Sequence, residues 1–186
     1  MSLVRPSLDY CSQIWGPAEG PLMDKLEKTL KDFAKLCLDI RYLSYEDRLR
    51  SMNIQSVQRR FDRYRVIYMK KVQLGLVPNP GVLVESNISA RCGFKFNIQN
   101  KNSKSGWTSA LRKTTFQYRA PRQFNSIPLE LRNMTSSMDV FKQKLDVFLH
   151  MIPDTPRIGS QLKSFISNDL DAQIQSWDWK IRNGPF

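Results

Sequence analysis

The sequence contains one histidine, three scattered cysteines and no long apolar run. His150 alone cannot supply a histidine-based catalytic triad or a His-rich metal site. Cys11, Cys37 and Cys92 lie far apart, so we expect reduced thiols rather than disulfides or a zinc site. No apolar run approaches the roughly 20 residues of a membrane helix, and the N-terminus has no signal-peptide core. We therefore expect an intracellular protein, in the nucleus or cytoplasm, without a membrane partner, metal or cofactor.

Acidic residues are also poorly placed for catalysis. Asp169 and Asp171 form the only close aspartate pair, with neither a third acidic residue nor a glycine-rich phosphate loop beside them. We interpret this pair as a solvated turn or as charges at a helix start. The sequence thus predicts no catalytic residues and no small-molecule substrate.

Positive charge is abundant and confined to one part of the chain. The 186 residues carry a net charge of +12, with 41% hydrophobic and 25% charged residues. Residues 1–43 hold six basic and six acidic side chains, and residues 151–186 hold four of each. Residues 44–150 hold 19 Lys and Arg against 7 Asp and Glu. This excess favours a polyanion, most simply RNA or DNA, although a solvated charged face remains an alternative.

Helical periodicity dominates the first half of the chain. Leu22, Leu26, Leu30, Phe33, Cys37 and Ile40 predict one amphipathic helix of about five turns. Ser44 and Asp47 form a capping box for a short helix, and Asn53 is the predicted cap of a longer one that extends to Leu74. On that longer helix, Ile54, Val57, Phe61, Tyr64, Tyr68 and Val72 share an apolar face. Another face carries Arg59, Arg60, Arg63, Lys70 and Lys71.

The sequence of the second half of the chain predicts a β-hairpin as well as helices. Alternation in GFKFNIQ and the turn NKNSKSG predict a small β-hairpin around residues 93–112. Residues 114–127 fit a helix or an irregular segment. Ser136 and Asp139 predict a capped helix with Phe141, Leu145, Phe148 and Leu149 on its apolar face. Residues 151–186 have no strong period, and we expect them to pack loosely. The predicted fold class is mainly α with one small β-hairpin.

The segment FQYRAPRQFNSIPLELR, residues 116–132, mixes aromatic and basic residues. Arg119 and Arg122 beside Tyr118 and Phe124 could bind phosphates and stack on bases. The alternative, which we favour for the aromatic residues, makes Phe116, Phe124 and Ile127 core anchors around a proline turn. The predicted nucleic-acid-binding residues are Arg59, Arg60, Arg63, Lys70, Lys71, Arg112, Lys113, Arg119 and Arg122. We expect replacement of Arg59, Arg60 and Arg63 to weaken binding while the fold survives.

Four stretches follow one another in a characteristic order. They are LVRPSLDYCSQIWGP, YLSYEDRLRSMNIQSVQRR, RCGFKF, and FQYRAPRQFNSIPLELR followed by DVFKQKL. In this order they resemble the region after the polymerase core in reverse transcriptases of non-LTR retrotransposons of the jockey and LINE type. The similarity covers roughly residues 2–150. The shared residues are Leu3, Val4, Arg5, Pro6, Leu8, Tyr10, Ser12, Trp15, Pro17, Tyr45, Arg48, Leu49, Arg59, Arg60, Arg119, Asn125, Ile127, Pro128, Phe141, Lys142 and Leu145.

Two departures from the family pattern stand out. Phe124 occupies the position of a usual tryptophan, and Cys92 interrupts an Arg-Gly pair between Arg91 and Gly93.

The resemblance implies a thumb-end helical segment over residues 1–43, a basic C-terminal domain over 44–150 and a divergent neutral tail over 151–186. It implies a fragment that grips template RNA or target DNA beside the missing polymerase core. No adjacent Asp-Asp pair is present to hold the two metal ions of that polymerase, so we expect no enzymatic activity. A helical protein-interaction module, or a decayed element without present activity, remains the alternative.

Overall fold

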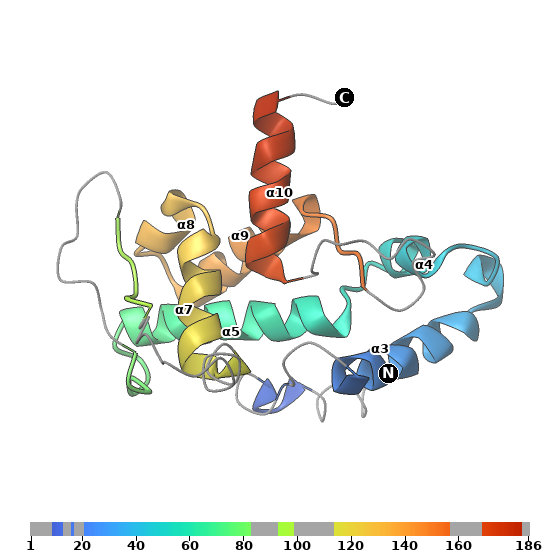
Figure 1. The fold of residues 1–186 in the computed structure, drawn as a ribbon, viewed down its shortest axis with the longest axis horizontal. Coiled ribbons are helices and arrows are strands. Elements are labelled where there is room, and N and C mark those ends of the chain that lie inside the picture. The colour runs from blue at the N-terminus through green and yellow to red at the C-terminus, as the bar shows by residue number, and fades with distance from the viewer. Residues whose placement is uncertain are drawn as a thin grey trace, which may run out of the picture. The chain divides into compact units, whose positions relative to one another are not determined.

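The structure is a computed structural model that describes residues 9–12, 16, 21–82, 93–98, 114–156 and 169–183. As predicted, these residues are mainly helical (Figure 1). Two compact units divide the chain, one formed by residues 1–61 with 153–186 and the other by residues 62–152. The helices are α3 (Pro21–Lys35), α4 (Tyr45–Ser51), α5 (Val57–Gln73), α7 (Phe116–Ser126), α8 (Leu129–Asn133), α9 (Met138–Met151) and α10 (Leu170–Asn183).

Helix α3 buries a different face from the one that the sequence predicts. Met23, Leu30 and Ala34 are buried, whereas Leu22 is 63% and Phe33 37% exposed. The helix also ends at Lys35, and a 3-10 helix follows at Leu38–Ile40. The buried face is rotated from the predicted stripe and overlaps it at Leu30 and at Leu26, which is partly buried against the core.

Tyr45 and Leu49 from α4, together with Val57 and Phe61 from the first turns of α5, complete the core of the first unit.

The helix starts follow local cap chemistry. Ser44 caps α4 as predicted, because its Oγ accepts a hydrogen bond from the Asp47 N–H at 3.2 Å. Helix α5 starts later than predicted, where Ser56 Oγ accepts from the Arg59 N–H at 3.1 Å. Asn53 instead has a positive φ of 51°, a left-handed conformation that suits a turn and not the entry to a helix. The predicted cap at Asn53 is therefore wrong.

The last part of the first unit contains an unpredicted helix. Helix α10 places Leu170 and Ile174, four residues apart, in the buried interior. The expectation that residues 151–186 pack loosely is wrong for this helix. The sequence does carry a signal for this helix, because Leu170, Ile174, Trp177 and Ile181 recur at spacings of four, three and four, and the prediction missed it.

The second unit is assembled around the later turns of α5. Helix α7 settles the open interpretation of residues 114–127 in favour of a helix, and Pro121 lies inside it. Helix α9 begins after Ser137, whose Oγ accepts from the Val140 N–H, one residue later than predicted. Its predicted apolar face is confirmed, since Phe141, Leu145, Phe148 and Leu149 are all buried.

Residues 93–98 dock on α7 and α8 through side chains that bond to their backbone. Asn125 donates to the Phe96 carbonyl at 2.7 Å and accepts from the Phe96 N–H at 3.0 Å. Asn133 accepts from the Phe94 N–H, and Arg132 donates to the Phe94 carbonyl, both at 3.1 Å. Within these six residues there is no strand. The rest of the predicted hairpin, residues 99–112, lies outside the described residues.

Gly93 allows this close approach, so we expect Gly93→Ala to destabilise the protein. An added Cβ would lie 2.2 Å from Leu129 Cδ1 and 2.6 Å from Asn133 Oδ1, at a φ of +59°. The strained backbone and the overlap together should lower the free energy of unfolding by roughly 2–4 kcal/mol. Urea denaturation measures this change.

Gly75→Ala is the matched control. Its φ is +69°, but nothing lies within 4 Å of the added Cβ. Only the backbone cost of about 1 kcal/mol should remain. Equal losses in the two variants would show that the contact with Leu129 and Asn133 does not constrain the docking.

Candidate nucleic-acid interface

Helix α5 carries five of the predicted phosphate-binding residues, and most of them are inside the protein. The side chains of Arg59 and Lys70 are 0% exposed, and Arg60 is 7% exposed. Phe61 on the predicted apolar face is also fully buried, which confirms that part of the prediction. Val57 on that face is buried too, but Tyr64, Tyr68 and Val72 are only partly buried, and other elements also cover the charged face. Replacing Arg59 and Arg60 would therefore disturb the interior, contrary to the expectation that the fold survives.

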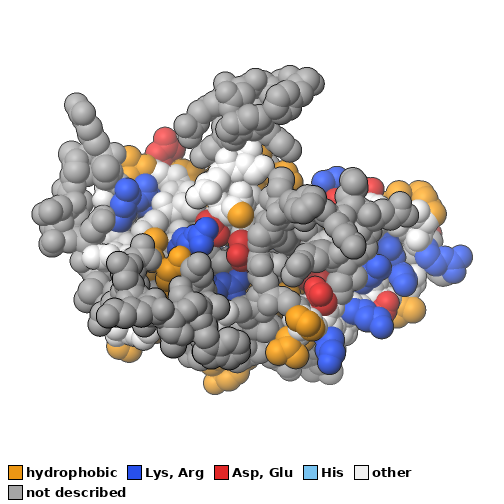
Figure 2. Space-filling view, in the orientation of Figure 1, with side chains coloured by type: hydrophobic (Ala, Val, Ile, Leu, Met, Phe, Trp, Pro, Cys, Tyr) orange, Lys and Arg blue, Asp and Glu red, His pale blue; other side chains and the backbone are white. Residues whose placement is uncertain are grey.

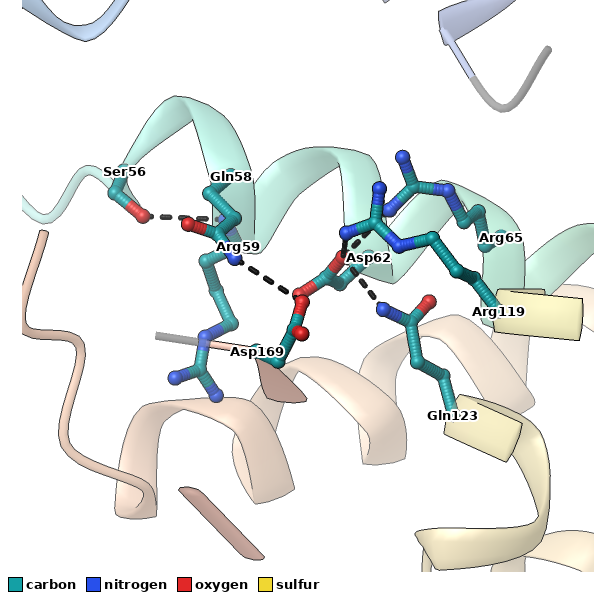
Figure 3. Close-up of polar contacts among 8 residues, drawn as sticks. All are labelled: Ser56, Gln58, Arg59, Asp62, Arg65, Arg119, Gln123 and Asp169. Atoms are coloured by element: carbon teal, nitrogen blue, oxygen red, sulfur yellow. Dashed lines mark hydrogen bonds and ion pairs between the residues drawn. The ribbon is translucent and has the colours of Figure 1, made fainter. Parts of the chain in front are cut away.

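Arg59 and Arg60 bind partners within the first unit. Arg59 Nη2 donates to the Pro153 carbonyl at 2.9 Å, while its Nε and Nη1 have no hydrogen-bond partner within the part of the chain that the structure describes. Arg60 forms an ion pair with Asp9. Beside them, Gln58 Nε2 donates to Asp169 Oδ1 at 3.3 Å (Figure 3). These contacts assign the first turns of α5 a structural role.

Arg63 belongs to the second unit and is only partly buried. Its Nε and Nη2 donate to the two carboxylate oxygens of Asp146 on α9, at 2.5 and 2.8 Å. A bidentate pair of this kind fixes the guanidinium plane. A phosphate could reach Arg63 only in competition with Asp146.

A buried carboxylate organises the centre of the second unit. Asp62 on α5 is fully buried and accepts hydrogen bonds from Arg65 Nη1 at 2.6 Å and Gln123 Nε2 at 2.8 Å. Arg119 Nη2 lies 4.0 Å from the same carboxylate oxygen. Figure 3 shows the three side chains converging on Asp62 from α5 and α7. Arg119, a predicted phosphate ligand, thus neutralises an internal charge.

Lys70 is a further interior cation on α5, in its last turn. Its Nζ donates to the Arg132 carbonyl at 2.8 Å and to Gln73 Oε1 at 2.9 Å, and it lies 5.4 Å from the ring centroid of Phe141. Burial lowers the pKa of the Lys70 ammonium to about 8. Through its hydrogen bond to the Arg132 carbonyl, the ammonium binds the last turn of α8, where carbonyl groups lack helical partners.

The segment at residues 116–132 has an inner and an outer side. Phe124 is fully buried, with its ring centroid 5.3 Å from that of Phe96, so the interpretation of this aromatic residue as a core anchor is confirmed. Arg122 is exposed, and Lys71 on α5 is partly exposed. Arg112 and Lys113 lie outside the described residues. Arg122 and Lys71 are thus the predicted ligands that the described structure leaves most accessible.

Surface cations also occur on α3, where the sequence predicted a neutral segment. Lys25, Lys28 and Lys35 are exposed, and so is Arg41 beyond the helix. In Figure 2, basic and hydrophobic side chains gather over the part of the surface formed by α3 and α4. The charge sum concealed these cations because it also counts the buried Glu27 and exposed acidic residues such as Asp32, which pairs with Lys35 at 3.6 Å. Helical spacing could have revealed it, since these lysines lie opposite Met23 and Leu30.

Comparisons with family models, curated proteins and solved structures give no match to the chain. Within the described residues, no group of three metal-ligating side chains comes together. Nor do these residues include a helix long and apolar enough to cross a membrane.

The Asp62 network generates a stability prediction. Asp62→Ala removes the carboxylate that buried Arg65 and Gln123 contact, which should lower the free energy of unfolding by roughly 3–5 kcal/mol. Denaturant titration of the purified protein measures the loss.

Asp139→Ala is the control, because it removes the exposed ion pair with Lys142 at 2.9 Å. Exposed pairs contribute little, so its unfolding midpoint should match that of the parent. If Asp62→Ala also unfolds at the parent midpoint, the network is not what holds α7 on α5.

Proposed function

We propose that this chain is a nucleic-acid-binding segment that corresponds to the region after the polymerase core of a non-LTR retrotransposon reverse transcriptase. It binds the phosphate backbone of RNA or DNA through surface cations of the second unit. It has no catalytic role of its own, and the polymerase core of the parent element is its natural neighbour. The nucleus and the cytoplasm are the compartments where it would meet its ligand.

The uneven division of charge between the two units carries this proposal. The second unit contains 15 Lys and Arg against 5 Asp and Glu, a net charge of +10 out of +12 for the chain. Among the residues of this unit that the structure describes, four cations and one anion are buried. Without these, 11 cations and 4 anions remain, a net charge of +7. A polyanion is the simplest partner for such a unit.

The interior contacts support the resemblance at the level of packing. Three residues on which the resemblance rests have packing roles. Asn125 binds the backbone of residues 93–98, and Phe141 and Leu145 belong to the buried face of α9. Gly93, which belongs to the Arg-Gly step, is held against α8. Residues of this kind preserve a fold. The proposed binding therefore depends on the surface charge and not on these residues.

One observation favours a protein-interaction module as the second candidate function. In the first unit, Leu22 is 63% exposed, Leu36 75% and Tyr42 83%. Large exposed apolar side chains of this kind occur at surfaces that bind another protein. The two candidate functions use different units and can be tested separately.

Binding should depend steeply on salt and little on sequence. We expect Lys71→Ala combined with Arg122→Ala to weaken binding to unrelated RNA and DNA oligonucleotides about equally, since phosphate contacts carry no base information. For each lost phosphate contact, the slope of log affinity against log salt should become less steep by roughly 0.7–0.9. Fluorescence anisotropy over a salt series measures both quantities.

The matched control is Lys25→Ala combined with Lys28→Ala, which removes the same charge from the exposed side of α3. Its slope should equal that of the parent. A flattened slope in the control and an unchanged one in the Lys71 and Arg122 variant would move the interface to the first unit. Absence of saturable binding by the folded parent protein would refute the proposed function and leave the interaction module.

A further inference from the structure

Glu27 is an acidic residue in the apolar interior of the first unit. It lies on the buried face of α3 with Met23, Leu30 and Ala34, and its side chain is only 3% exposed. Burial of a charged carboxylate is costly unless the carboxylate is paired or accepts a proton. Within the described residues, the Glu27 carboxylate makes its hydrogen bonds with Tyr45 Oη and the Val57 N–H, and with no Lys, Arg or His side chain.

The carboxyl group joins three helices. Tyr45 Oη of α4 lies 2.6 Å from Glu27 Oε1, and the Val57 N–H at the start of α5 donates to Oε2 at 2.9 Å. Tyr45 is itself buried. A single side chain of α3 therefore fixes both α4 and the first turn of α5.

A second carboxylate binds the same helix start. Asp154 accepts hydrogen bonds from the Ser56 N–H at 2.8 Å and from Ser56 Oγ at 2.7 Å. The groups around Glu27 are thus Tyr45 of α4, Asp154 of the segment after α9, and the N–H groups of Val57 and Gln58 in α5. Arg48 of α4 lies near Tyr45, and Arg59 of α5 donates to the Pro153 carbonyl.

These surroundings act in opposite directions on the charge of Glu27. Burial and repulsion by Asp154 disfavour the ionised form, while the hydrogen bonds from Tyr45 and the start of α5 favour it. Burial dominates and raises the pKa of Glu27 to about 7. Burial, followed by the charge of Glu27, also raises the pKa of Tyr45, so the phenol stays protonated.

We propose that Glu27 is a proton-operated latch that holds α3 against α4 and the start of α5 when it is neutral, and that weakens when it ionises. In the neutral form the carboxyl proton lies on Oε1 and is donated to Tyr45 Oη, which can accept as well as donate. The Val57 N–H continues to donate to Oε2. Ionisation keeps the same partners but leaves a buried negative charge beside Asp154.

The direction of the pH effect follows from the two states of the chain. The folded protein keeps the Glu27 proton up to about pH 7, whereas the unfolded chain releases it near the ordinary value of 4.5. The latch therefore stabilises the fold fully below the unfolded pKa, and this contribution is lost as the pH rises through the folded pKa. The unfolding equilibrium constant should increase up to about 70-fold from about pH 5 to about pH 8 because of Glu27 alone.

The test compares the full chain with Glu27→Gln by denaturant titration across this pH range. The glutamine amide can donate to Tyr45 Oη and accept from the Val57 N–H, so it imitates the neutral latch without titrating. Parent and variant should agree near pH 5, and the parent should become the less stable of the two by up to about 70-fold near pH 8. Parallel pH profiles of the two proteins would overturn the proposal.

Two further measurements keep the test decisive if Glu27→Gln folds poorly. Asp24→Asn removes the same charge from α3 at a side chain that remains partly in solvent, and it should keep the pH profile of the parent. NMR titration of the Glu27 carboxyl carbon in the parent should give a midpoint near 7, against about 4.3 for a solvated glutamate. A midpoint close to the solvated value would refute the latch directly.

Discussion

Helix α5 has little surface in contact with water, and this constraint determines the role of nearly every charged residue on it. A buried polar group needs a hydrogen-bond partner, and donors and acceptors around the helix form hydrogen bonds with its side chains. Asp62 accepts hydrogen bonds from Arg65 and Gln123, and Lys70 donates to a carbonyl at the end of α8. At the start of the helix, carboxylates from distant parts of the chain take up the free N–H groups. The same residue types on an exposed helix would be available to a ligand.

This constraint changes how the positive charge of the chain is interpreted. Buried arginines and lysines count toward the net charge, but they are occupied by carbonyl groups and carboxylates inside the protein. Their removal from the sum still leaves the second unit strongly basic, which is why nucleic acid remains the proposed ligand. The cations proposed to bind phosphate are therefore residues nearer the surface, such as Lys71 and Arg122, and not the buried arginines of α5. By contrast, the charges of residues 1–43 sum to zero, and this sum conceals the exposed lysines of α3.

The residues on which the proposed resemblance rests explain packing better than chemistry. Asn125 bonds both backbone groups of Phe96, and Phe124 fills the position of a usual tryptophan among phenylalanine rings. Gly93 leaves room for Leu129 and Asn133 at a positive φ. A sequence motif of this kind records how two segments fit together. These contacts concern packing, and the ligand has to be inferred from the surface.

The sequence by itself determined the mainly helical class, the Ser44 cap, the buried face of α9 and the location of the charge excess. All four depend on neighbours within a few residues or on composition, which a single sequence displays. Only the tertiary structure decided that Arg59, Lys70 and Arg119 are interior, that Leu22 and Phe33 are at the surface, and that α10 joins the first unit. Periodicity shows which residues share a helix face. How many faces become covered depends on segments that are distant in sequence. Asp154 and Glu27, for example, both bind N–H groups at the start of α5, and no local sequence pattern indicates these contacts.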